Sequence, residues 1–336
     1  MRSPAWGGSA TQLPGVGVCV LRVQFVTLRQ KMQTITTPAA AGVLLGDYMG
    51  GIIASLRASG HARTSETYSS ALSSFSKFMA PKPPTLADFT DDTLQAYEGY
   101  LLGRGLVRNS VSFYMRILRA VYNRAADAGL VAFQHPFRHV YTGVDRTVKR
   151  ALSAAEVARV RDLPLAHLPQ LAYARDMFML SFYLRGMSFI DMALLQRDQL
   201  RYGRVEYVRR KTGRSMSVAW LPEMQAIVDR YPPASPYLLP LIGGRMPSVR
   251  PACRKVAYNI NRRLKEVGCL AGIAAPLTMY VARHSWASAA YSRGVPLSVI
   301  SEGMGHDSEH TTRIYLASLD NDEVDRANRE VISSLG

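Results

Sequence analysis

Four apolar stripes in the first half of the chain constrain its fold more than any other feature of the sequence. Within residues 40–130, apolar side chains recur every three or four positions, which is the period of an amphipathic helix. Prolines between residues 81 and 84 and glycines at 103 and 105 separate neighbouring stripes. The pattern therefore predicts four helices, each with one apolar face. The stripes are Leu44, Tyr48, Ile52 and Leu56; Tyr68, Leu72, Phe75 and Phe78; Leu94, Tyr97 and Leu101; and Val111, Tyr114, Leu118 and Val121.

The second half of the chain combines helices with a β-hairpin. Residues 172–182 and the segment after Pro222 have helical periodicity, whereas residues 204–210 and 215–220 alternate in the manner of strands. Residues 211–214 join the two alternating segments and contain a glycine, which predicts a tight turn. We therefore expect a mainly α fold with a small antiparallel β-sheet in the second domain.

Length and composition indicate two domains joined by a linker. A chain of 336 residues is longer than one ordinary domain. Residues 131–149 contain proline and several basic residues, and we expect them to be an exposed basic linker. Ser153 and Glu156 then form the capping-box pattern that begins a helix. These features predict a helical domain over 40–130 and a second domain over 150–336.

Residues 1–31 are interpreted as an upstream extension with little folded structure, and Met32 as the natural start. The apolar run over 16–26 is interrupted by Arg22 and flanked by proline and glycine, and a signal peptide is the alternative interpretation. No apolar run of 18 residues is free of charge, so no membrane span is expected. The three cysteines form no spaced pair or metal motif, which favours a cytoplasmic protein.

The chain is strongly basic. Its formal net charge is +16 and its pI about 10.0, and such a charge attracts polyanions, above all nucleic acid. A membrane surface or a ribosome is the alternative partner. Arginines gather on the polar faces of the predicted helices. A role in phosphate contacts and a merely solvated surface are equally good interpretations of them. The residues expected to bind DNA phosphates outside the second domain's core are Arg108, Arg116, Lys149 and Arg150.

Near the C-terminus, an arginine, a histidine and a tyrosine follow one another over a short stretch. Arg283 can bind a phosphate through two parallel hydrogen bonds of its planar guanidinium. His306 can give or take a proton near neutral pH. Tyr315 has a hydroxyl that can attack phosphorus and remain attached to it. Together they predict a protein that cuts a nucleic-acid backbone and stores the bond energy on a tyrosine.

Two more basic residues precede this group in the chain. Arg185 lies in an apolar stretch and needs a partner, because an unpaired buried charge is costly. An ion pair with Asp191 or Asp176 is one interpretation of this arginine, and a phosphate is the other. Lys211 lies in the predicted hairpin turn, where a single lysine is more often simply solvated. The order Arg, Lys, Arg, His, Tyr favours a common site for these residues.

The sequence resembles the tyrosine recombinase (phage integrase) family over roughly residues 40–325. The resemblance implies a helical, SAM-like core-binding domain and a mixed catalytic domain that clamp double-stranded DNA. It implies a site-specific recombinase of the mobile-element type, a homotetramer on its recombination sites, and accessory DNA-bending proteins. The segment from Asp320 to Leu335 is expected to be a C-terminal helix for oligomerisation. The motifs that carry the resemblance are Tyr280-Val281-Ala282-Arg283-His284-Ser285-Trp286, Met304-Gly305-His306 and Thr312-Arg313-Ile314-Tyr315.

The resemblance also implies residue roles. Arg283 matches the second arginine of the family's active site, His306 the histidine after it, Lys211 the hairpin lysine and Tyr315 the nucleophile. The arginines would neutralise the phosphate, and the lysine would protonate the leaving 5′ oxygen. The 3′-phosphotyrosine would conserve the bond energy, so neither metal nor nucleotide cofactor is expected. A type IB topoisomerase-like enzyme, or a DNA-binding protein that has lost catalysis, is the alternative.

Two positions depart from the family pattern. Tyr280 stands where the family has a histidine, and we expect it to hydrogen-bond the phosphate without acting as a proton shuttle at neutral pH. Ser188, three positions before Asp191, stands where the family has its first arginine. Arg185 comes one helical turn earlier, so we expect Arg185 to reach the same phosphate.

Overall fold

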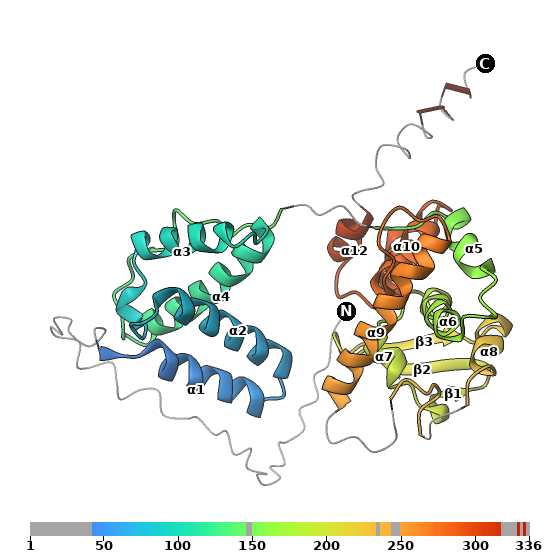
Figure 1. The fold of residues 1–336 in the computed structure, drawn as a ribbon, viewed down its shortest axis with the longest axis horizontal. Coiled ribbons are helices and arrows are strands. Elements are labelled where there is room, and N and C mark those ends of the chain that lie inside the picture. Colours follow the sequence, from blue (N-terminus) through green and yellow to red (C-terminus); the bar gives the residue numbers. More distant parts are fainter. Residues whose placement is uncertain are drawn as a thin grey trace, which may run out of the picture. The chain divides into compact units, whose positions relative to one another are not determined.

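The computed structural model describes residues 42–145, 150–232, 236–242, 249–316, 328–329 and 332–333. The chain divides into two compact units, Met1–Arg146 and Thr147–Gly336 (Figure 1). The described elements are mostly helical, with one small antiparallel sheet, so the predicted fold class is confirmed. Within the described residues, no helix is long and apolar enough to cross a membrane.

In its described residues, the first unit has four α-helices and one short 3-10 helix around an apolar and aromatic core, and the helices predicted within 40–130 are all present. Phe75 and Tyr97 are fully buried and meet edge to face, with their ring centroids 5.0 Å apart. The Tyr97 hydroxyl satisfies its hydrogen-bonding need by donating to Ser74 Oγ at 2.7 Å. The elements are α1 (Leu45–Ala58), α2 (Ala62–Met79), the short 3-10 helix η2 (Leu86–Asp88), α3 (Asp91–Gly103) and α4 (Arg108–Asp127).

The segment after α4 packs against the first unit up to residue 145. Phe137 and Val140 are buried in the core of this unit. The side chain of Asn109 exchanges two hydrogen bonds with the backbone of Asp145, at 3.0 and 2.8 Å. This differs from the exposed linker expected over 131–149, because two apolar side chains in a polar, proline-containing segment are enough to anchor it.

The second unit surrounds a three-stranded sheet with helices. The strand order is β1-β2-β3, antiparallel throughout, and Val205 lies opposite Val218 in the hairpin. The strands are β1 (Leu200–Arg201), β2 (Arg204–Val208) and β3 (Ser215–Ala219). The helices are α5 (Ala154–Asp162), α6 (Pro169–Tyr183), α7 (Phe189–Ala193), η3 (Arg197–Gln199), α8 (Pro222–Val228), α9 (Val249–Leu270), α10 (Met279–Tyr291), α11 (Leu297–Gly303) and α12 (Glu309–Leu316).

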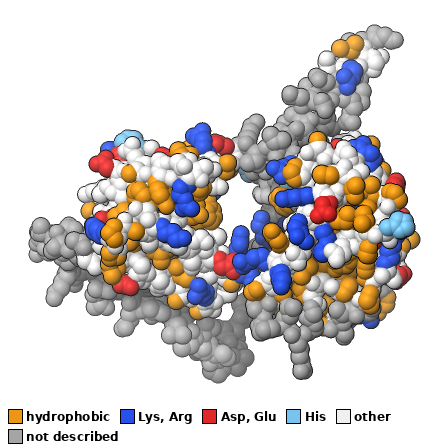
Figure 2. All heavy atoms as spheres, viewed as in Figure 1, with side chains coloured by type: hydrophobic (Ala, Val, Ile, Leu, Met, Phe, Trp, Pro, Cys, Tyr) orange, Lys and Arg blue, Asp and Glu red, His pale blue; other side chains and the backbone are white. Residues whose placement is uncertain are grey.

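Helix α6 is the centre of the second unit. It packs against both α9 and α10, and Met177, Phe178 and Leu180 on it are completely buried. A helix that is buried on most of its circumference cannot shift without repacking its neighbours. Helix α6 therefore fixes the position of α10 and of the turn that follows α6. Lys and Arg side chains are spread over the drawn face of each unit (Figure 2).

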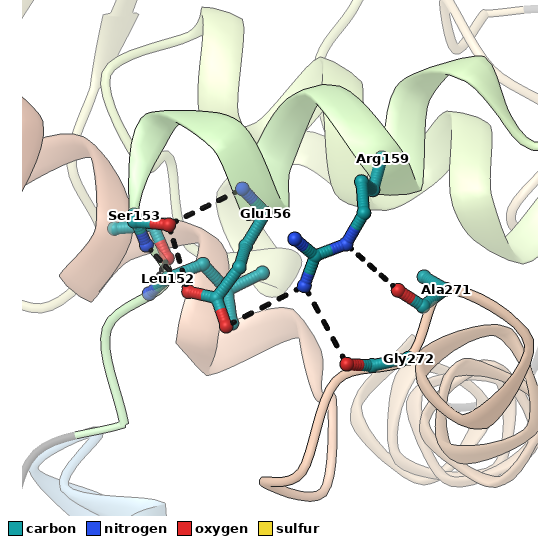
Figure 3. Close-up of polar contacts among 7 residues, drawn as sticks. Leu152, Ser153, Glu156, Arg159, Ala271 and Gly272 are labelled. Carbon is teal, nitrogen blue, oxygen red and sulfur yellow. Dashed lines mark hydrogen bonds and ion pairs between the residues drawn. The ribbon is translucent and has the colours of Figure 1, made fainter.

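The beginning of the second unit is tied to α9 and α10 (Figure 3). Ser153 and Glu156 form the predicted capping box at the start of α5. The Leu152 N–H donates to Ser285 Oγ on α10 at 2.9 Å. Arg159 Nε donates to the Ala271 carbonyl, just after α9, at 3.0 Å. These contacts hold three helices of the unit in one arrangement.

The proposed extension over 1–31 lies outside the described residues. So does the proposed C-terminal helix over 320–335, apart from residues 328–329 and 332–333.

Candidate active site

Helix α10 presents Arg283 toward the turn that follows α6. The arginine is 5% exposed, and its Nη1 donates to the Gly186 carbonyl at 2.8 Å. Its Nη2 donates to the Met304 carbonyl, at the end of α11, at 2.6 Å. Gly186 has φ +71°, and a Cβ at this position would lie 2.5 Å from the Arg283 Cα. Only glycine lets the turn approach α10 this closely.

His306 lies against the Arg283 guanidinium. Its Nε2 is 2.9 Å from Arg283 Nη2, and its Nδ1 is 2.7 Å from Thr312 Oγ1 on α12. Because an arginine only donates hydrogen bonds, Nε2 accepts and Nδ1 carries the proton that Thr312 accepts. The histidine thus joins α10 to α12, the helix that contains Tyr315.

The imidazole of His306 is neutral at pH 7 in this structure. Burial, and then the charges of Arg283, Arg209 and Lys211, lower the pKa of His306 to about 3. Removal from water disfavours the charged ring, and neighbouring cations do the same. In the free protein this histidine therefore accepts a hydrogen bond and has no proton to give from Nε2.

The turn between β2 and β3 is tied to the loop before His306. Lys211 is exposed in this turn, as expected, and lies near enough for its charge to act on His306. Arg209 Nη1 donates to the Gly305 carbonyl, and Arg214 Nη1 donates to the His306 carbonyl. The hairpin lysine and the histidine are thus held in the same part of the second unit.

Arg185 lies in a left-handed turn rather than on a helix. Its φ is +58°, and α6 has already ended at Tyr183, so the expectation that it lies one helical turn before Ser188 is wrong. Two consecutive residues of positive φ, Arg185 and Gly186, reverse the chain here. The half-buried side chain runs toward α11, with its Cδ 3.7 Å from the Cβ position of Gly303.

Neither candidate carboxylate pairs with Arg185 within the described residues. Asp176 binds Arg175 and Arg230, with N–O distances of 2.9 Å each. Asp191 accepts hydrogen bonds from the Ser188 hydroxyl at 2.7 Å and from the Arg210 backbone N–H at 3.0 Å. The ion-pair interpretation of Arg185 thus has no support in this part of the chain.

Tyr207 on β2 shows which cations share one neighbourhood. Burial, and then the charge of Asp191, raise the pKa of Tyr207 to about 12, and the charges of Arg283, Arg209 and Arg185 oppose that rise. All three arginines are therefore close enough to act on one ring. Arg209 was not among the predicted site residues. It follows directly after β2 and is buried, and the two-residue period continued from β2 places it on the same face as Val205 and Tyr207.

The remaining predicted residues of the second unit are exposed, or their side chains lie outside the described part. Tyr280 is 56% exposed on the first turn of α10, and its ring meets that of His284 edge to face. Tyr315 belongs to α12, but its side chain is outside the described part, and so is Lys149. Arg150 is exposed.

Arg108 and Arg116 belong to the first unit, and both are exposed on α4. The Arg108 guanidinium lies 4.1 Å from the centroid of the Tyr141 ring and 3.8 Å from Asp145. In the described segments of both units, no group of three or more His, Cys, Asp or Glu side chains could hold a metal ion.

Comparisons with known proteins identify the family. Two family models match: the phage integrase SAM-like domain over residues 44–140 and the phage integrase family over residues 241–322. Tyrosine recombinase XerD of Rhizobium meliloti is 27% identical over 282 residues, which are 77% of this chain and 86% of that protein. The chain belongs to the tyrosine recombinase (phage integrase) family. A second XerD, from Chlorobaculum tepidum, is 27% identical over 187 residues, 51% of this chain and 58% of that protein.

Solved structures of this family share the fold. A lambda integrase dimer bound to a COC′ core site aligns with a TM-score of 0.62 at 14% identity, covering 83% of this chain and 79% of that one. The XerH recombinase bound to a palindromic difH substrate aligns with a TM-score of 0.60 at 15% identity, covering 79% of each chain. These structures support the fold, and the two family models confirm the resemblance inferred from the C-terminal motifs.

Proposed function

We propose that this tyrosine recombinase cuts and rejoins double-stranded DNA at specific sites through a 3′-phosphotyrosine intermediate. The observation that carries the proposal is the contact of Arg283 with His306, which in turn binds the helix that contains Tyr315. The exposed Lys211 is close enough to act on the same histidine. A cationic cluster next to a tyrosine-bearing helix is suited to a phosphodiester, because it neutralises the anion that repels a nucleophile.

The proposed chemistry assigns one task to each group. The Tyr315 oxygen attacks phosphorus, and its proton must leave during the step, because an ordinary tyrosine pKa is about 10. Arg283 holds the non-bridging oxygens, whose charge grows in the pentavalent state. Lys211 donates a proton to the leaving 5′ oxygen. His306 is neutral and orients Arg283 by accepting a hydrogen bond at Nε2. Its ring can donate to a phosphate oxygen only after Nε2 has gained a proton, which a bound anion favours.

The proposed partners extend beyond one chain. Solved relatives include a lambda integrase tetramer bound to a Holliday junction. We propose that this protein also works as a homotetramer on paired recombination sites, with residues 320–335 docking on a neighbouring copy and with accessory DNA-bending proteins. Exposed basic residues of the first unit, Arg108 and Arg116, would bind phosphates away from the cut, and Lys149 and Arg150, at the start of the second unit, would do the same.

A nicked suicide substrate tests the nucleophile. Tyr315→Phe should keep DNA binding but form no covalent adduct on a denaturing gel, because only the attacking oxygen is removed. Tyr291→Phe is the matched control. It removes the hydroxyl of a tyrosine on α10 and should form the adduct at the wild-type rate. An adduct that persists in Tyr315→Phe would assign the attack to another residue.

A plasmid that carries two cognate sites separates the three candidate functions. Recombinant products indicate a recombinase, relaxation alone a topoisomerase-like enzyme, and binding alone a protein that has lost catalysis. The reaction should proceed in excess EDTA and without nucleotide, because the tyrosyl ester conserves the bond energy. Cleavage that only added Mg²⁺ restores would contradict this mechanism.

A further inference from the structure

Ser188, at the position of the family's first arginine, has a structural task in this chain. It is the N-cap of α7, and its hydroxyl lies 3.4 Å from the Asp191 backbone N–H and donates to the Asp191 carboxylate at 2.7 Å. A capping serine is neutral. The site therefore lacks one positive charge at this position, and the phosphate needs that charge from elsewhere in the cluster.

Arg209 is a charge without a described counter-charge. Its side chain is 5% exposed, and its guanidinium donates to the Gly305 carbonyl. Within the described residues no carboxylate lies within ion-pair distance of it, and the nearby Asp191 is engaged by Ser188 and by the Arg210 backbone. Burial of a guanidinium without a counter-charge is unfavourable, so an anion that enters the site would stabilise it.

The side chain of Arg209 lies beside the groups already assigned to the phosphate. Its Cδ is 3.0 Å from the Cβ position of Gly305, the residue before His306. The charges of Arg209 and Arg283 both lower the pKa of His306, and both act on Tyr207. The charges of two guanidinium groups, one on α10 and one just after β2, therefore act on the same imidazole.

Helix α7 fixes the turn that begins with Arg209. The Asp191 carboxylate accepts the N–H of the next residue, Arg210, at 3.0 Å. The Arg209 N–H donates to the Arg214 carbonyl at 2.8 Å, and the Gly213 N–H donates to the Arg209 carbonyl at 2.8 Å. The short α7, which in the family's pattern carries an arginine, here supplies the carboxylate that holds an arginine of the hairpin in place.

From this arrangement we infer that Arg209 supplies the positive charge that Ser188 does not, and binds a non-bridging oxygen of the scissile phosphate together with Arg283. The inference rests on the proposed function. Arg209 forms no covalent bond and gives up no proton in this role, since its guanidinium is charged at every relevant pH. It stabilises the charge that builds on phosphorus oxygens as Tyr315 attacks.

Removing the charge of Arg209, and separately that of the scissile phosphate, tests the inference. Arg209→Ala should form the covalent adduct on the order of 10²-fold more slowly than the wild type, with DNA affinity and melting temperature close to normal. Arg209→Lys should recover part of the rate. Arg210→Ala, an exposed neighbour in the same turn, is the matched control and should cleave at the wild-type rate.

A substrate with a neutral methylphosphonate at the scissile position provides the deciding measurement. If Arg209 neutralises the missing oxygen, Arg209→Ala should cleave this substrate nearly as fast as the wild type, so the defect of about 10²-fold should largely disappear. An equal defect on both substrates, or cleavage of the ordinary phosphodiester within threefold of the wild type, would overturn the inference.

The remaining outcomes are also decisive. A fall in melting temperature that parallels the loss of cleavage in both Arg209→Ala and Arg209→Lys would assign Arg209 to the fold and overturn the inference. Failure of the proposed function itself looks different, because the wild-type protein would then form no adduct on either substrate.

Discussion

His306 illustrates how single residues in this site depend on their neighbours. Its pKa is about 3 in the folded protein, against about 6.5 for an unperturbed histidine. Between these pH values the unfolded chain binds a proton that the folded chain does not, so stability falls as the pH falls. Well above pH 6.5, His306 is neutral in both the folded and the unfolded chain, so its contribution to the free energy of unfolding is constant.

The lowered pKa of His306 predicts how the stability of the protein changes with pH. The free energy of unfolding of the wild type, measured relative to His306→Gln, should decrease as the pH is lowered from 7.5 to 4.5 and stay constant between 7.5 and 8.5. Denaturant titrations at these pH values give the difference directly. A difference that does not change with pH would mean that His306 has the pKa of an exposed histidine in the folded state, and a difference that grows on acidification would mean that it is protonated there.

The second prediction concerns Gly186, whose absent side chain lets the turn after α6 contact Arg283. Gly186→Ala should destabilise the protein by about 1–3 kcal/mol more than Gly203→Ala, because the new Cβ would lie 2.5 Å from a backbone atom of α10. Gly203 is a matched control, with φ +70° against +71° and open space around its Cβ position. Equal stability losses, measured by thermal unfolding, would contradict the close approach.

Local sequence patterns located some residues of this site and missed others. Arg283 and Lys211 were predictable because short motifs place them, one on a helix and one in a hairpin turn. The left-handed turn at Arg185 and the burial of Arg209 depend on contacts with α10, α11 and the loop before His306. Such contacts join residues about 100 positions apart, and no local periodicity encodes them.

At the scale of elements, the helices and the hairpin were predictable for the same reason. Apolar periodicity, proline and glycine breaks and the capping box at Ser153 act over a few residues each. The packing of residues 131–145 on the first unit was missed, because Phe137 and Val140 are isolated apolar residues without a period. Elements were thus predictable, and their partners were not.

The third prediction tests one contact between elements. Ser285→Ala on α10 removes the acceptor of the buried Leu152 N–H, which should cost about 1–3 kcal/mol of stability. Ser298→Ala, at an exposed position on α11, should change stability by less than about 0.5 kcal/mol. Chemical denaturation of both variants is the measurement. Equal effects would show that the tether between the start of α5 and α10 contributes nothing.

At the scale of the whole molecule, the two units have separate cores. One apolar cluster lies within residues 45–140, and the others lie within residues 152–316. Each unit also carries Lys and Arg on its surface (Figure 2). Separate cores joined by a short connection permit each unit to bind DNA with its own basic surface, which is how a clamp would work.

The last prediction measures that clamp through salt. Each phosphate contact made by Lys or Arg releases counterions, so the logarithm of the affinity falls with the logarithm of the salt concentration by about one unit of slope per contact. Arg116→Ala in the whole chain should therefore weaken binding to any sequence and lower the slope by about one. Arg63→Ala is the control and should leave the slope unchanged. Arg63 is also exposed on α2, but it already forms an ion pair with Glu66 at 3.6 Å.

A fragment comparison extends the same argument to the connection between the units. The whole chain should bind with a steeper salt slope than residues 147–336 alone, because the first unit adds its own phosphate contacts. A mixture of the two separate units should bind far more weakly than the whole chain, since the linkage makes the second binding event intramolecular. If residues 147–336 alone matched the whole chain in affinity and slope, the first unit would make no phosphate contacts and the clamp would be wrong.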